Sequence, residues 1–142
     1  MPKIRLHNDN EQILAVWVEP IGEDFWMRPK EQFTISTDAT ADADPDEAPF
    51  EVVLHAKGVS VFQSTGHEAV VRDQSGTEVA CGHQRPLEVL RAWTESAEAA
   101  VQRTAGSSPT VREMTREHAE FMRRELTRAE ATMQAQERRS SP

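Results

Sequence analysis

The amino-acid sequence predicts an α+β protein, namely a small antiparallel β-sandwich or barrel followed by two C-terminal α-helices. Three observations lead to this fold class. In residues 1–84, short runs of alternating apolar and polar side chains are separated by Pro- and Gly-containing turns at a spacing of roughly 8 to 12 residues, which is typical of sandwiches and barrels. After Pro86 the apolar residues recur with a helical period, and residues 104–109 interrupt that period. We therefore expect an antiparallel β domain over 1–84 and a two-helix extension over 85–142.

The alternation predicts about seven short strands. Residues 12–19 are apolar on nearly both faces, which favours a central strand. Pro20 and Gly22 allow the chain to reverse after it, and Lys57 and Gly58 form a two-residue hairpin turn. The segments with strand periodicity are 4–6, 12–19, 25–27, 33–35, 50–54, 59–62, 69–71 and 79–81, the last two forming a final hairpin around 74–76.

Residues 38–49 differ in composition from the segments on either side. They contain five acidic residues and two prolines, but no basic residue and no large apolar residue. A segment of this kind cannot bury enough apolar surface to fix its conformation, so we expect an acidic, mobile loop.

Two helices are expected, at 86–103 and 109–138. The second begins at a Ser108 or Thr110 N-cap, and Thr110 would complete a capping box with Glu113. The first helix has an apolar stripe along one face, formed by Leu90, Trp93, Ala97, Ala100 and Val101.

The second helix carries an apolar stripe that we interpret as a binding surface. With Ala129 counted between Leu126 and Met133, its members are separated by three or four residues and therefore share one helical face. About 28 residues form a helix of about 42 Å, whereas a domain of about 85 residues is only about 25–30 Å across. The helix must extend beyond its own domain, so its stripe needs a second surface. The candidate partner-binding residues are Val111, Met114, His118, Met122, Leu126 and Met133.

Charge and cysteine content restrict the function classes. Sixteen basic and 24 acidic residues give a net charge of −8, which repels phosphate backbones and anionic lipids. No apolar window reaches the roughly 18 residues of a membrane-spanning helix, and the N-terminus lacks a signal-peptide core. Cys81 has no disulfide partner within the chain, which fits a reducing compartment, and thirteen Arg against three Lys indicate a high-GC bacterial coding sequence. We expect a bacterial cytoplasmic protein that binds neither nucleic acid nor membranes.

A metal site is the main alternative interpretation. Cys81 and His83 lie two residues apart on a predicted strand and would project to one face, where His55 and His67 could join them. In copper-binding sandwiches a Met follows the Cys and His closely, whereas the next methionine here is Met114. The competing interpretation, which we favour, is that the histidines lie on the surface and the thiol is buried in the core. We therefore assign no metal or cofactor.

Two further groups of residues have both a functional and a structural interpretation. Trp17 and Trp26 could line a small-ligand site, although packing in the core explains them better. Glu19, Glu23 and Asp24 could act as paired carboxylates in acid–base catalysis, but acidic residues near a turn also serve solubility. No nucleophile or phosphate-binding motif accompanies them, so we predict no enzymatic activity.

One motif resembles a known group of sequences. Glu19-Pro20-x-Gly22-Glu23, followed by two aromatic residues and by Pro29-x-x-x-Phe33-x-Ile35, resembles a motif in short, uncharacterised bacterial proteins with a similar β region. The resemblance covers roughly residues 4–83. It implies a fold and no known activity.

Three functional hypotheses follow from the sequence. The first is a non-enzymatic protein that binds itself or another protein through helix 109–138. The second is a β domain that binds a metal or a small ligand, using either the Trp17 and Trp26 pair or the set His55, His67, Cys81 and His83. In the third, the first helix packs on the sheet while the C-terminal helix stays mobile and has no binding role.

Overall fold

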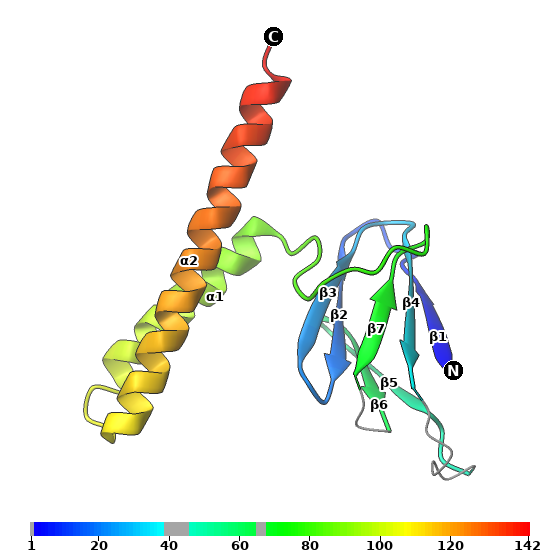
Figure 1. The fold of residues 1–142 in the computed structure, drawn as a ribbon, viewed down its shortest axis with the longest axis horizontal. Helices are drawn as coiled ribbons and strands as arrows, with labels where there is room; N and C mark the ends of the chain where they lie inside the picture. Colours follow the sequence, from blue (N-terminus) through cyan, green and yellow to red (C-terminus); the bar gives the residue numbers. More distant parts are fainter. Residues whose placement is uncertain (1, 39–45, 65–67) are drawn as a thin grey trace. The chain divides into compact units, whose positions relative to one another are not determined.

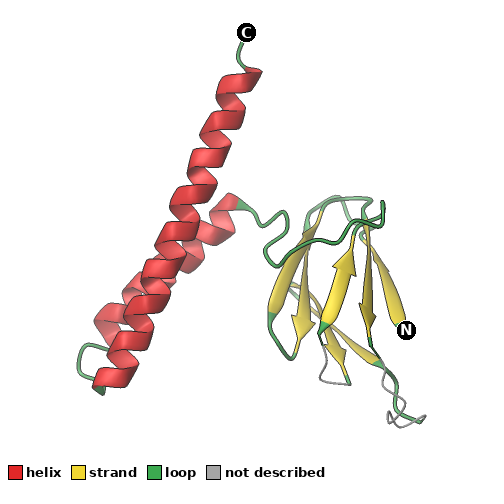
Figure 2. Ribbon diagram, viewed as in Figure 1, coloured by secondary structure: helices red, strands yellow, loops and turns green. Residues whose placement is uncertain are grey.

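The computed structural model describes residues 2–38, 46–64 and 68–142 (Figure 1). It contains seven strands in two sheets and two C-terminal helices, which confirms the α+β prediction (Figure 2). The sheets form a sandwich-like arrangement, and the described strands do not close into a barrel. The chain divides into two compact units, Met1–Arg85 and Pro86–Pro142. Most of the predicted acidic loop, at 39–45, lies outside the described residues.

The first sheet has three antiparallel strands in the order β1-β4-β7. These strands are β1 (Lys3–His7), β4 (Gln32–Thr37) and β7 (Ala69–Arg72). Their side chains alternate, with mainly apolar residues on the inner face and mainly polar residues on the outer face, where Val70 is the apolar exception.

The second sheet has four strands in the order β3-β2-β6-β5. They are β2 (Leu14–Glu19), β3 (Glu23–Met27), β5 (Phe50–His55) and β6 (Gly58–Gln63). The β2–β6 pair is parallel, whereas the other strand pairs of the two sheets are antiparallel. Gly58 makes this pairing possible, because its φ is 149° and a Cβ atom there would collide with the carbonyl oxygen of Ala15.

Side chains from both sheets form the core of the β unit. Strand β2, buried on most of both faces, is central as predicted. The buried core residues are Val16, Val18, Phe25, Met27, Phe33, Ile35, Val59, Val61 and Val71.

The predicted strand at 79–81 is wrong. After a turn at Asp73, Glu78 forms an isolated bridge with Arg72, and the N–H of Val79 donates to the carbonyl oxygen of Val71 at 2.9 Å. The chain then turns at Gly82, which has a φ of 82°, and runs beside β3, where the N–H of Trp26 donates to the carbonyl oxygen of His83 at 2.9 Å. Alternation alone favoured a hairpin, but the contacts of this segment with β3 compete with pairing along β7.

The helices are α1 (Leu87–Arg103) and α2 (Pro109–Ser140), close to the predicted limits. Ser108 is the N-cap of α2, and its Oγ accepts the N–H of Val111 at 3.4 Å. Thr110 lies inside the helix, so the alternative capping box with Glu113 does not form. Pro109 takes the first helical position, where its missing N–H has no cost.

The two helices form an antiparallel hairpin with a small core of its own. Thr94 is fully buried, and its hydroxyl donates to the carbonyl oxygens of Leu90 at 2.7 Å and Met122 at 3.3 Å. Trp93 packs against the edge of this core. The buried apolar residues are Leu90, Ala97, Ala119, Met122 and Leu126.

Candidate functional site

The predicted partner-binding stripe of α2 divides into two parts. Met122 and Leu126 are buried against α1, with only 6% and 4% of their surface exposed. Val111, Met114 and His118 remain exposed, and Met114 keeps 64% of its surface. Met133 is also 46% exposed. Helix α1 therefore buries part of the stripe that the sequence predicted as a binding surface.

Phe121 is an exposed apolar residue that the sequence analysis missed. It is 50% exposed and follows Val111, Met114 and His118 at spacings of three, four and three residues. These four residues form a stripe on α2, which we call the outer stripe. Phe121 precedes the buried Met122 by one residue, or about 100° around the helix. Spacings of three and four fit both stripes, so periodicity alone could not separate them.

Ion pairs join the two helices on the flank away from the outer stripe. The Nε of Arg123 donates to Oε1 of Glu98 at 2.7 Å, and the Nε of Arg91 donates to Oε1 of Glu130 at 3.3 Å. A groove of about 530 Å³ runs along this flank. Its lining residues are Glu98, Val101, Gln102, Arg116, Ala119, Glu120, Arg123 and Arg124. This flank thus combines ion pairs with a groove whose lining surface is mainly apolar, whereas the outer stripe consists of exposed side chains on α2 alone.

The four residues of the metal hypothesis do not form a site in the part of the chain that the structure describes. His67 lies outside the described residues. His55 is on β5, where its Nε2 is 3.1 Å from the Oγ of Ser60, and the His83 ring lies 5.7 Å from the ring of Phe33. Among the described residues, no group of three or more His, Cys, Asp or Glu side chains is arranged to hold a metal ion.

Cys81 is exposed, which contradicts the prediction of a buried thiol. It lies in the segment that replaces the predicted last strand, and its Sγ donates to Oδ1 of Asp24 at 3.5 Å. Partial burial and the neighbouring Asp24 raise the pKa of the Cys81 thiol. The thiol is therefore held in its less reactive, protonated form.

Asp24 connects the last segment of the β unit to β3. It is 3% exposed, and its carboxylate accepts hydrogen bonds from Arg85 Nε at 2.8 Å, from Arg85 Nη2 at 2.6 Å and from Trp26 Nε1 at 2.7 Å. Burial raises the pKa of Asp24, but the hydrogen bonds and positive charge of Arg85, with the Trp26 bond, outweigh it and lower the pKa below its usual value. A general acid near neutral pH needs the opposite shift, so Asp24 serves as a structural clasp.

Trp17 and Trp26 lie on one face of neighbouring strands, since Trp17 is opposite Asp24 and Trp26 is opposite Ala15. Trp26 is 9% exposed and donates its indole N–H to Asp24. Its ring is thus buried around the clasp, on the face of β3 opposite to the core residues Phe25 and Met27, and Trp17 on the same face is half-buried, so neither ring packs in the core cluster that the sequence favoured.

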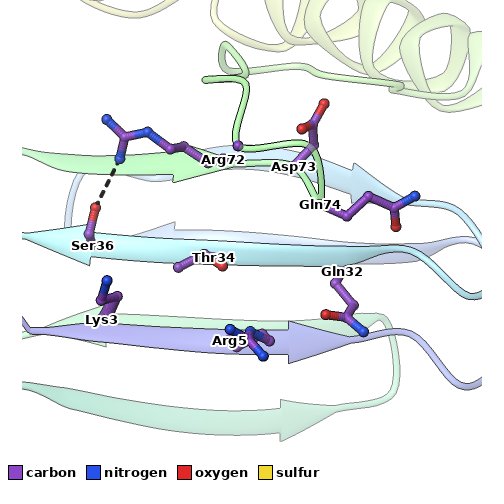
Figure 3. Close-up of a pocket in the computed structure, with 9 residues that line it drawn as sticks. Lys3, Arg5, Gln32, Thr34, Ser36, Arg72, Asp73 and Gln74 are labelled. Carbon is purple, nitrogen blue, oxygen red and sulfur yellow. Dashed lines mark hydrogen bonds between the residues drawn. The ribbon is translucent and has the colours of Figure 1, made fainter.

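A second polar site lies on the outer face of the sheet β1-β4-β7. It is a hollow of about 460 Å³, and Lys3, Arg5 and Arg72 bring three positive charges to it from two strands (Figure 3). Thr34 and Ser36 of β4 lie between these strands. The hollow was missed in the sequence because its residues come from distant parts of the chain and meet only through strand register.

Comparison with family models, with curated proteins and with solved structures finds no match to this chain. No helix among the described residues has the length and apolar character needed to cross a membrane.

Proposed function

We propose that this protein is a non-enzymatic, self-associating protein of a bacterial cytoplasm, and that two copies bind through the outer stripe of α2. The observation that carries the proposal is the position of Val111, Met114 and Phe121, which are 40–64% exposed beside a small helical core. The single cysteine and the Arg-rich composition support the compartment and the source.

A hairpin of two helices is a single layer, and stable domains contain at least two layers around a core. A second hairpin supplies the missing layer as a four-helix arrangement. Fully burying a Phe or Met side chain stabilises by about 1.5–3 kcal/mol, so a half-exposed side chain contributes about 1 kcal/mol. Three such side chains from each copy together stabilise the dimer by a free energy that is comparable to the lower estimates of the free energy that association costs. We therefore expect a reversible dimer that dissociates on dilution.

Charge favours the hairpin over the β unit as the contact between copies. Residues 86–142 contain nine acidic and nine basic side chains, whereas residues 1–85 contain fifteen acidic and seven basic ones. The whole net charge of −8 therefore belongs to the β unit. Two hairpins can approach each other without net repulsion, while two β units cannot.

The charges beside the outer stripe also match an antiparallel second copy. Glu117 precedes Phe121 by four residues and Arg124 follows it by three, so all three share one side of α2. Neither Glu117 nor Arg124 forms an ion pair with a described residue. A two-fold axis near Phe121 places Glu117 of each copy beside Arg124 of the other.

Sedimentation velocity of the full chain over a range of concentrations tests the proposal. We expect a concentration-dependent dimer for the natural chain and a monomer for Phe121→Glu. Thr127→Glu is the matched control, because it adds the same charge at an exposed position on the other side of α2 and should keep the dimer. A natural chain that stays monomeric at every concentration, or a dimer that Phe121→Glu leaves intact, would refute the proposal.

Charge reversal tests the antiparallel arrangement. Glu117→Arg alone should weaken the dimer by about three- to tenfold in Kd, because it replaces two symmetric attractions by repulsions. Combining it with Arg124→Glu should restore the Kd. A double variant weaker than Glu117→Arg would contradict the antiparallel placement.

A further inference from the structure

The outer face of the sheet β1-β4-β7 concentrates positive charge. Strand register places the backbone of Arg5 opposite Thr34 and that of Thr34 opposite Arg72, and the Arg72 guanidinium reaches the neighbouring row, where its Nη1 is 3.4 Å from the Oγ of Ser36. Lys3 lies opposite Ser36 in the next row. Figure 3 shows these side chains around the hollow, with Ser36 and Thr34 between the cations. The arrangement combines three cations and two hydroxyl groups on one face.

This concentration of positive charge is unusual for the β unit that contains it. Residues 1–85 have only seven basic side chains against fifteen acidic ones, yet three of the seven line this hollow. The outward strand positions 3, 5, 7, 32, 34, 36, 70 and 72 include no carboxylate. Lys3, Arg5 and Arg72 form no ion pair with any described residue.

Two described carboxylates lie close to these cations. Glu78 bridges to Arg72 through the backbone but forms no ion pair with it, and Asp73, which lines the hollow, is held by its own turn. Asp73 Oδ1 accepts the Ser75 hydroxyl at 2.6 Å and the N–H groups of Ser75 at 2.9 Å and Thr77 at 3.1 Å. These hydrogen bonds, the Ser75 hydroxyl first among them, hold the pKa of Asp73 below its usual range. Asp73 Oδ1 is thus held by the turn, and no described carboxylate forms an ion pair with any of the three cations.

The polar groups of the hollow match an oxyanion. The Nη1 of Arg72 donates weakly to the Oγ of Ser36 at 3.4 Å, which leaves most of its five N–H donors for another acceptor. Guanidinium groups bind phosphate oxygens through two parallel hydrogen bonds, and the Thr34 hydroxyl can donate to a remaining oxygen, whereas the Ser36 hydroxyl donates to the carbonyl oxygen of Val70 at 3.5 Å. A volume of about 460 Å³ suits a small molecule.

We propose that this hollow binds a small phosphate monoester, with its phosphate held over β4 between Arg72 on one side and Lys3 and Arg5 on the other. The three cations and the Asp73 carboxylate that line the hollow leave two positive charges, which balance the charge of about −1.5 to −2 on a phosphate monoester. A nucleic acid would extend over the acidic remainder of the β unit and be repelled there. The proposal concerns a different unit from the self-association above, and neither depends on the other.

Titration of the full chain with sn-glycerol 3-phosphate, followed by ¹H–¹⁵N chemical shifts at constant ionic strength, tests the proposal. We expect saturable shifts confined to β1, β4, β7 and the turn after β7. Inorganic phosphate should cause shifts at the same residues with equal or weaker affinity, and chloride at the same ionic strength should not. Shifts that do not saturate, that chloride reproduces, or that map elsewhere would overturn it.

Matched variants distinguish binding at this hollow from a general effect of the protein's positive charges. Arg5→Gln and Arg72→Gln should each weaken binding by about tenfold or more, because each removes charged hydrogen bonds. Both residues are outside the buried core, so the fold should persist. Lys57→Gln removes the same charge in the exposed turn before β6 and should leave the Kd unchanged, and Phe121→Glu should do so as well. An equal loss in Lys57→Gln, or no loss in Arg72→Gln, would refute the site.

Discussion

The β unit and the helical hairpin bury their apolar side chains to different degrees. In the β unit, two sheets cover a core in which Phe33, Met27 and Ile35 have no exposed surface. In the hairpin, the buried apolar residues keep 4–6% of their surface, and a second apolar stripe lies on the outside of α2. The difference follows from the number of layers, because a sandwich closes over its core and a pair of helices does not. The first unit covers its apolar core with two sheets, while the second leaves apolar side chains of α2 exposed beside its small core.

The largest loss of stability should come from removing a large side chain from the core of the β unit. Phe33→Ala should destabilise the β unit by about 3–5 kcal/mol, because it removes a fully buried ring and leaves a cavity. Phe62→Ala is the matched control, since Phe62 is 41% exposed, and its cost should be below about 1 kcal/mol. Urea unfolding followed by the NMR signals of the strands measures both. Similar losses for the two variants would mean that the core is not closed.

The clasp between Asp24 and Arg85 should have the next largest effect. Asp24→Asn should destabilise the β unit by about 2–3 kcal/mol at pH 7, because it leaves a largely buried guanidinium without its counter-charge. The folded-state pKa of Asp24 is lowered, so the clasp's contribution is present above the unfolded-state pKa and is lost as the pH falls through the folded-state value.

The difference in unfolding free energy between the natural chain and Asp24→Asn should therefore be full above about pH 5 and shrink below about pH 4. Urea unfolding at a series of pH values provides the measurement. A difference that stays constant down to pH 2 would contradict the role of the charge.

A smaller effect should distinguish the two stripes of α2. Leu126→Ala should destabilise the hairpin by about 2–3 kcal/mol, because Leu126 packs against α1. Met114→Ala should change the stability of the dilute monomer by less than about 0.5 kcal/mol, because Met114 is 64% exposed. Amide hydrogen exchange in α1 and α2 at low protein concentration compares them. Equal changes would show that the stripes are not separate.

The sequence predicted the positions of the strands and helices better than it predicted which of them lie next to each other. Alternation located β1 to β7, and the break at 104–109 located the hairpin turn, because both signals are local. The parallel pairing of β2 with β6 depends on the close approach of Gly58 to Ala15. Alternation with a period of two identifies a strand but does not show which other strand pairs with it. The segment 79–81 has strand alternation, yet it is displaced by contacts with β3 that are distant in sequence.

The same limit applies to the candidate sites. The residues of α2 were recognised as apolar and helical, but which of them α1 covers could not be known before the hairpin was formed. Phe121 was missed for that reason. The basic hollow left no sequence signal at all, because Arg5 and Arg72 lie in strands that are far apart in the chain and become neighbours only on either side of β4.

Strand β5 has a consequence for handling the protein. It is the edge of its sheet, and Val52, Val53 and Leu54 are 40%, 40% and 78% exposed along it. An apolar edge with unpaired backbone groups is a template for aggregation, and the surplus of acidic side chains in the same unit opposes the approach of another copy. Acidification towards the isoelectric point removes this repulsion. Purification and storage should therefore favour neutral or alkaline buffers, in which precipitation through β5 is suppressed.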